Sequence, residues 1–278
     1  MLSELRHRDA LLFWTGAFML LLLLLATLIS ISDTRQILGL NPWIKPMKFM
    51  TSITIFLWSV AWYMPQTTGG VSGASPSSVV SGFSRIDKRQ IVRWTIATAM
   101  VVEILAIVLQ SFRGTTSHFN HATAFDDMIF GIMGMGVVFN TLAMVLFLWI
   151  VRRDTPPSRA GYIWGIRLGV AMFLLASLQG TVIVGNDAHS VPGPDGGPGL
   201  PFVNWSTTQG DLRVAHFFGM HALQALPLLG FLLDRSGVRG GNPSGLPRNL
   251  VIATGILWLA ITGGLLLMAL QGRPLVAL

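Results

Sequence analysis

Long apolar stretches, separated by short polar connections, recur along the whole chain. A run of about 20 apolar residues crosses the roughly 30 Å hydrocarbon layer of a membrane as an α-helix. The sequence lacks the short alternating segments that are typical of a membrane β-barrel. We therefore predict an all-α, polytopic membrane protein, a single domain (residues 1–278) with seven transmembrane helices. The predicted spans are about 10–31, 46–64, 91–112, 127–151, 162–185, 212–233 and 250–270.

Two connections between these spans differ in composition. Residues 65–90 are rich in Gly and Ser, which predicts a flexible cytoplasmic loop without a site. Residues 186–210 hold several prolines, which stiffen the backbone, and Phe202, Val203 and Trp205, which offer apolar anchors. We expect this second segment to be a structured outer loop, or lid, over the helix ends.

Composition and charge strengthen the membrane assignment and orient the chain. Apolar residues make up 52% of the chain and charged residues only 11%, too few for a protein with a hydrated surface. Thirteen of the nineteen Lys and Arg residues lie in segments 1–9, 65–93, 152–167 and 234–249, at one end of the predicted helices. Because cationic loops stay in the cytoplasm, we predict a plasma (inner) membrane protein with a cytoplasmic N-terminus and its C-terminus outside.

Two further facts narrow the function. The net charge of +7 is explained by topology, so membrane lipids are the expected partners and nucleic acid is not. The chain contains no cysteine, which excludes thiol catalysis, disulfides and iron–sulfur clusters. A bound metal would therefore be held by imidazole nitrogens and by oxygens.

The histidines gather on the side opposite to the cations. Five of the six lie at or near the predicted outer ends of the helices. They are His118, His121, His189, His216 and His221. We therefore expect a polar pocket that opens outward, formed by the third, fourth and sixth predicted helices beneath residues 186–210.

The first hypothesis for this pocket is a metal or haem site in a redox or hydrolytic protein, because imidazole is the commonest protein ligand for such ions. The cofactor would be haem b or a divalent ion of zinc, iron or copper, and a zinc-bound water would permit hydrolysis. The predicted metal ligands are His118, His121, Asp126 and His216. Cations suited to haem propionates are Lys45, Lys48, Arg113 and Arg213.

The second hypothesis starts from two ionisable residues deep in predicted spans. Glu103 lies midway along the third span and His221 about 15 Å into the sixth, and such residues are costly in a membrane unless they have a function. Gln110 and Gln224 share their helix faces, and Pro227 frees a backbone carbonyl nearby. These residues predict a proton-handling pair, Glu103 and His221, in a proton-coupled transporter or a site for quinone or another small hydrophobic substrate.

Structural roles explain the same residues without a ligand. Loop histidines at a membrane surface need no partner, and Glu103 and His221 would satisfy each other by a buried hydrogen bond if the third and sixth helices were neighbours. Asp127 is placed to cap the fourth helix. The sequence leaves these alternatives open, and with them the choice between an enzyme and a transporter.

Overall fold

The computed structural model describes residues 2–64, 87–153, 159–236 and 245–278. Most of the predicted loop at 65–90 lies outside the described residues. The structure is all-α apart from two short paired strands, β1 (Ser190–Val191) and β2 (Gly210–Asp211). Its helices are α1 (Leu2–Arg8), α2 (Ala10–Ser32), α3 (Ile44–Tyr63), α4 (Lys88–Arg113), α5 (Ala124–Arg153), α6 (Ala160–Gly185), α7 (Leu212–Arg235) and α8 (Gly245–Leu270).

Each predicted span coincides with one long helix, from α2 to α8. Six of these helices, all except α3, are long and apolar enough to cross a membrane. The helix α3 is of similar length, and its first turn carries Lys45 and Lys48. The chain is therefore a multi-pass helical membrane protein.

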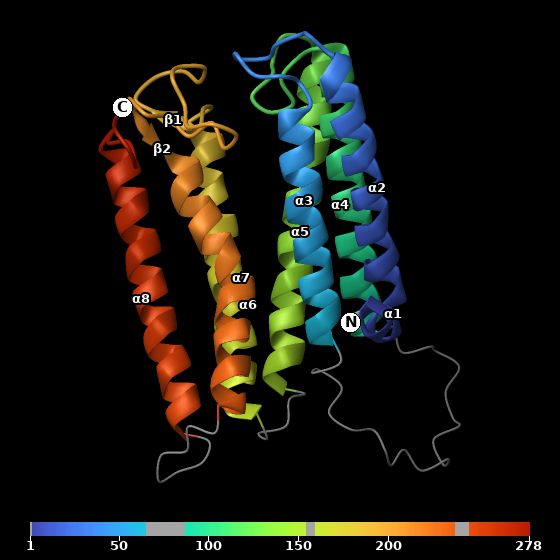
Figure 1. Cartoon of the computed structure of the whole chain (residues 1–278), viewed down its shortest axis with the longest axis vertical. Helices are drawn as coiled ribbons and strands as arrows, with labels where there is room; N and C mark the ends of the chain where they lie inside the picture. Colours follow the sequence, from blue (N-terminus) through green and yellow to red (C-terminus); the bar gives the residue numbers. More distant parts are fainter. Residues whose placement is uncertain (1, 65–86, 154–158, 237–244) are drawn as a thin grey trace.

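The long helices run side by side in two groups, α2–α5 and α6–α8 (Figure 1). Residues 33–43, 114–123 and 186–211 lie at one end of the bundle together with the C-terminus, and we call this the histidine end. The N-terminus lies at the opposite end, which we call the N-terminal end.

Aspartates begin several helices, because a carboxylate satisfies amide groups that lack partners in a first turn. Asp9 accepts from the Leu12 amide at 3.0 Å at the start of α2, and Asp211 caps α7 in the same way through the Arg213 amide. At the other end of α4, Gly114 adopts the left-handed conformation (φ 73°) that ends many helices.

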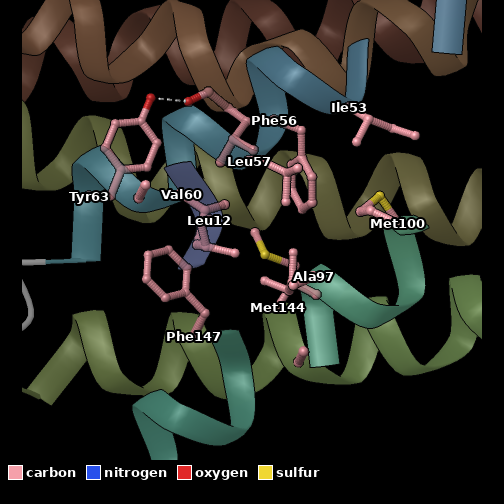
Figure 2. Close-up of a cluster of buried hydrophobic side chains, with 14 of the residues drawn as sticks. Leu12, Ile53, Phe56, Leu57, Val60, Tyr63, Ala97, Met100, Met144 and Phe147 are labelled. Atoms are coloured by element: carbon pink, nitrogen blue, oxygen red, sulfur yellow. Dashed lines mark hydrogen bonds between the residues drawn. The ribbon is translucent and has the colours of Figure 1, made fainter. Parts of the chain in front are cut away.

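The largest cluster of buried apolar side chains holds α2–α5 together. Leu12 of α2, Leu57 of α3, Ala97 of α4 and Phe147 of α5 converge in it (Figure 2). Large apolar side chains on the outer faces stay exposed, for example Ile256 of α8. Such surfaces suit a lipid environment, where exposed apolar groups carry no penalty.

In the second group, α6 and α7 approach backbone to backbone. A Cβ atom added at Gly230 would lie 2.2 Å from the Gly161 carbonyl oxygen, and one at Gly165 would lie 2.4 Å from that of Leu226. Only glycine permits such proximity, as is common where membrane helices pack closely.

The two groups of helices meet mainly through α5 and α6, and polar contacts also join α3 to α7. Pro227 has no amide hydrogen, so the Leu223 carbonyl, four residues earlier, has no helical partner. The Tyr63 hydroxyl donates a hydrogen bond to this carbonyl at 2.8 Å (Figure 2), and one turn away Gln224 Nε2 donates to Ser59 Oγ at 3.3 Å. The carbonyl freed by Pro227 thus joins the two halves of the protein.

Candidate functional site

Three ionisable side chains from separate parts of the first helix group meet at the histidine end. Lys45 Nζ lies 3.2 Å from His118 Nδ1, and His118 Nε2 lies 4.0 Å from Glu103 Oε1. We call these three residues the His118 cluster. Lys45 comes from the first turn of α3, Glu103 from the middle of α4, and His118 from the loop after α4. The cluster unites one predicted residue from each of the three sets drawn from the sequence.

The contacts of His118 assign its tautomer. A lysine ammonium has only donors, so Nδ1 accepts from Lys45 and the ring hydrogen lies on Nε2, directed towards Glu103. Ser117 Oγ also lies 3.2 Å from Nδ1. The Nδ1 nitrogen is therefore engaged within the cluster, whereas Nε2 lies beyond hydrogen-bond distance of Glu103.

Aromatic rings surround the His118 imidazole. The ring centroids of Phe49 and Phe130 each lie 5.9 Å from that of His118, and the centroid of Phe119 lies 6.2 Å away. Burial, together with the nearby charges of Lys45 and His189, holds the pKa of His118 well below its usual range. The imidazole is therefore neutral at pH 7, the form that accepts at one nitrogen and donates at the other.

Glu103 is the least satisfied acid in the described part of the chain. The residue is only 5% exposed, and its Oε2 has no hydrogen-bond partner among the described residues. An ionised carboxylate in such a place is costly unless it is paired. Glu103 is thus the described acid best placed to exchange a proton.

A histidine–aspartate pair in the 186–211 segment lies beside the cluster. His189 Nδ1 pairs with Asp195 Oδ2, and Asp195 Oδ1 accepts from the backbone amides of His189 and Ser190. The His189 ring packs edge-on against Phe119 at 5.0 Å. This pair was missed in the sequence, although aspartate in a Pro-Gly-rich turn commonly binds nearby amides.

Protonation of this pair is set by opposing effects. Burial lowers the pKa of His189 although Asp195 favours its charged form. For Asp195, burial opposes ionisation, but the hydrogen bonds from His189 prevail and bring its pKa to about 2. The pair therefore places a carboxylate next to the positive charge of Lys45, with which it interacts electrostatically.

Lys48 and Arg213 mark the edge of the same region. Lys48 Nζ donates to the Val203 carbonyl at 3.3 Å, and Arg213 binds Asp211 through two nitrogens and also contacts the Asn204 carbonyl. These contacts tie α3 and α7 to the 186–211 segment. Within the described ranges, neither Lys45 nor Lys48 has a carboxylate within ion-pair distance.

Arg113, Gln110 and Asp126 form a separate network. Arg113 pairs with Asp126, whose Oδ1 also accepts from Gln110 Nε2 at 2.8 Å. Thr123 Oγ1 donates to Asp126 Oδ2 at 2.6 Å, and the Asp126 amide donates back to Thr123 Oγ1 at 3.1 Å. This reciprocal arrangement is a cap for α5, so the residue that serves the start of α5 is Asp126, where we had expected Asp127.

Asp127 instead binds His121 at the surface. His121 Nδ1 lies 2.6 Å from Asp127 Oδ1, and its Nε2 lies 3.3 Å from Asp187 Oδ1. Asp127 belongs to α5 and Asp187 follows α6. Hydrogen bonds to both carboxylates raise the pKa of His121.

The two histidines of α7 bind backbone carbonyls. His216 Nδ1 donates to the Ala176 carbonyl at 2.9 Å, and His221 Nδ1 to the Phe217 carbonyl of its own helix at 2.7 Å. The expected hydrogen bond between Glu103 and His221 does not form among the described residues. The reason is that α7 packs mainly on α6 and α8, whereas α4 packs mainly on α5 and α3.

The four predicted metal ligands are not brought together. His118 faces Lys45 and Glu103, His121 faces two aspartates, Asp126 faces Arg113, and His216 faces Ala176. In the part of the chain that the structure describes, no group of three or more histidine, aspartate or glutamate side chains is arranged to hold a metal ion.

Comparison with known proteins gives no family for this chain. It matches no protein-family model, and no curated protein and no solved structure shows significant similarity to it. Its function is therefore argued from the site alone.

Proposed function

We propose that the protein spans the plasma (inner) membrane seven times, with its N-terminus in the cytoplasm and the histidine end outside. The helix α3 is the seventh span, because it packs along α2 and α4 over a similar length. Two features support the orientation. The described cations are concentrated in α1, near the starts of α4, α6 and α8 and at the ends of α5 and α7, all at the N-terminal end. The termini lie at opposite ends of the bundle (Figure 1).

At the histidine end, we propose a proton-coupled site for a small hydrophobic molecule that carries a carbonyl group, such as a quinone. The observation that carries this proposal is the row Lys45, His118 and Glu103, in which a neutral imidazole separates a cation from a buried acid. A bound carbonyl needs a hydrogen-bond donor, which Glu103 becomes only when it is protonated. Phe49 and Phe130 supply flat apolar surfaces next to His118.

The row permits a balanced proton relay. The Lys45 ammonium gives a proton to His118 Nδ1 while His118 Nε2 gives its own to the Glu103 carboxylate, so the imidazole ends neutral as it began. Lys45 then takes a proton from the outer solution. The 4.0 Å gap between Nε2 and Oε1 closes to hydrogen-bond distance by side-chain rotation when the substrate binds.

The test is proton uptake on binding. Adding decylubiquinone to the purified protein in a weakly buffered neutral detergent solution should cause uptake of about one proton, measured with a pH indicator, and infrared difference spectra should show a new carboxylic acid band. Glu103→Gln should abolish both signals, and His118→Gln should slow the uptake. The matched control Glu4→Gln, at the exposed N-terminal end, should retain both. Uptake that is equal in Glu103→Gln and the wild type would contradict the proposal.

A haem b or a zinc, iron or copper ion is the second candidate, and one observation favours it. His216 and His221 both donate Nδ1–H to carbonyls, the arrangement that fixes metal-binding histidines and leaves Nε2 as the ligand. A Soret band or stoichiometric metal in the purified protein, lost in His216→Ala, would support this candidate. If the purified protein binds decylubiquinone fully but contains neither haem nor stoichiometric metal, the proton-coupled site remains as the one candidate.

A further inference from the structure

The imidazole of His189 is held in one orientation and one tautomer. Asp195 Oδ1 accepts from the amides of His189 and Ser190 at 2.9 and 3.1 Å, and Asp195 Oδ2 pairs with His189 Nδ1. The His189 carbonyl in turn accepts from the Leu212 amide, at the start of α7, at 2.9 Å. Because an ionised carboxylate only accepts, the ring hydrogen lies on Nδ1 and the lone pair of the neutral ring lies on Nε2.

The second ring nitrogen of His189 is free and lies near the outer solution. Among the described residues, His189 Nε2 has no hydrogen-bond partner. The side chains of His189 and Asp195 are 20% and 19% exposed, whereas that of Glu103, the acid of the His118 cluster, is only 6% exposed. His189 is therefore better placed than Glu103 to take a proton from outer water.

The same imidazole borders the His118 cluster. The ring centroid of Phe119 lies 5.0 Å from that of His189 and 6.2 Å from that of His118, so both imidazoles pack on one phenyl ring. Lys45, which contacts His118, also interacts electrostatically with His189 and Asp195. Lys45 is thus a neighbour of both imidazoles, and its flexible four-carbon stem allows the ammonium group to turn from one to the other.

The charges around His189 suit a group that passes protons on. They come from Asp195 of its own segment, Lys45 of α3, His118 of the loop after α4, and Arg213 and His216 of α7. Burial lowers the pKa of His189, and the positive charges of Arg213 and Lys45 lower it further, although Asp195 opposes them. When Lys45 gives up its proton, one of these positive charges disappears, so the proton affinity of His189 rises. Loss of a proton from Lys45 thus favours the capture of a new one at His189.

We propose that His189 is the residue through which a proton from the outer solution reaches Lys45, with Asp195 as the positioning residue. This inference rests on the proposed proton relay. Outer water gives a proton to His189 Nε2, which forms an imidazolium beside the Asp195 carboxylate. Nε2 then gives this proton to the neutral Lys45 amine, which becomes an ammonium again, and His189 returns to its neutral form.

The test compares two rates when the full chain is mixed rapidly with decylubiquinone. In His189→Gln, the carboxylic acid band of Glu103 should appear at the wild-type rate, because Lys45 already holds the proton for that step. Uptake of the replacement proton, followed with a pH indicator, should keep its amount but be slower by about tenfold or more.

Two controls separate proton transfer from a structural role. Added 4-methylimidazole should restore the rate of uptake in His189→Gln, because a soluble imidazole can deliver the proton in place of the missing side chain. The indicator is calibrated with acid in each solution. His121→Gln, which removes another imidazole at the histidine end, should retain the wild-type rate.

A further variant tests the positioning role of Asp195. In Asp195→Asn the amide lacks the negative charge that favours the imidazolium form of His189. Uptake should therefore be slower, and the pH dependence of its rate should move to lower pH.

The coupling between His189 and Lys45 is measured without quinone, by nitrogen NMR of histidine-labelled protein. Lys45→Gln should raise the pKa of His189, whose signal is identified by its loss in His189→Gln. An unchanged pKa, uptake in His189→Gln at the wild-type rate, or slow uptake that 4-methylimidazole does not restore would each overturn the role of His189 alone. Wild-type protein without proton uptake, or equal uptake in Glu103→Gln, would overturn the relay itself and the role of His189 with it.

Discussion

The helix α7 contacts α6 and α3 in opposite ways. Against α6 it packs through glycines, backbone to backbone, along most of its length. Against α3 it uses side chains: Leu223 belongs to the same buried apolar cluster as Leu57 and Val60, and two polar contacts, Tyr63 with Leu223 and Gln224 with Ser59, join the helices.

The difference separates a fixed interface from an adjustable one. A glycine interface has no side chains that could rearrange, so α6 and α7 move as one body. Single hydrogen bonds in a membrane protein contribute on the order of 0.6 kcal/mol, so the two polar contacts with α3 add little to the stability of that boundary. Lys45 of the His118 cluster lies on α3, the helix on the other side of this boundary.

The largest effect is expected from a substitution that disrupts the fixed interface between α6 and α7. Gly165→Ala places a Cβ atom 2.4 Å from the Leu226 carbonyl oxygen and should destabilise the protein by about 3 kcal/mol, because overpacking forces the backbones apart. Thermal unfolding in detergent measures the loss. Gly263→Ala in α8 is the control: nothing lies within 4 Å of its added Cβ, and it should be neutral or stabilising. Equal losses in the two variants would mean that the α6–α7 interface is not close-packed.

A smaller effect is expected at the adjustable boundary. Tyr63→Phe leaves the Leu223 carbonyl without a partner and should cost about 1–2 kcal/mol. Pro227→Ala restores an amide hydrogen that closes the helical hydrogen bond to the same carbonyl. In the Pro227→Ala background, Tyr63→Phe should therefore cost about 1 kcal/mol less. A double-mutant cycle of unfolding free energies measures this coupling, and simple additivity would show that the proline and the tyrosine act independently.

The smallest effect concerns the surface link between the two helix groups. His121 bridges Asp127 of α5 and Asp187 after α6, and hydrogen bonds to both carboxylates raise its pKa above the ordinary histidine value of 6.5. The stabilisation is therefore fully present below pH 6.5 and is lost as the pH rises through the raised pKa. The unfolding midpoint should fall slightly over that range in the wild type, and His121→Gln should remove this component. An identical pH profile in His121→Gln would show that the link carries no stability.

Many residues of the candidate site could be named from the sequence, but which of them lie together could not. Lys45, His118 and Glu103 were each singled out in the sequence, yet Lys45 and His118 belonged to the metal or haem hypothesis and Glu103 to the proton-handling pair. Their union depends on the 114–123 loop, which places His118 between Lys45 and Glu103 and beside Phe49 and Phe130. Loop conformation is not encoded in hydrophobic periodicity, which also explains why the His189–Asp195 pair was missed.

The sequence by itself determined that the chain is helical and membrane-embedded, and it placed every long helix to within a few residues. It could do so because lipid offers no hydrogen-bond partners, so each helix must satisfy its own backbone groups, and this constraint acts on each helix separately. Only the tertiary structure decided which helices are neighbours. That α7 lies against α6 and α8, and that Glu103 faces His118 and not His221, depends on packing between residues far apart in the chain. In that packing, glycine size and one carbonyl freed by Pro227 matter more than the apolar pattern.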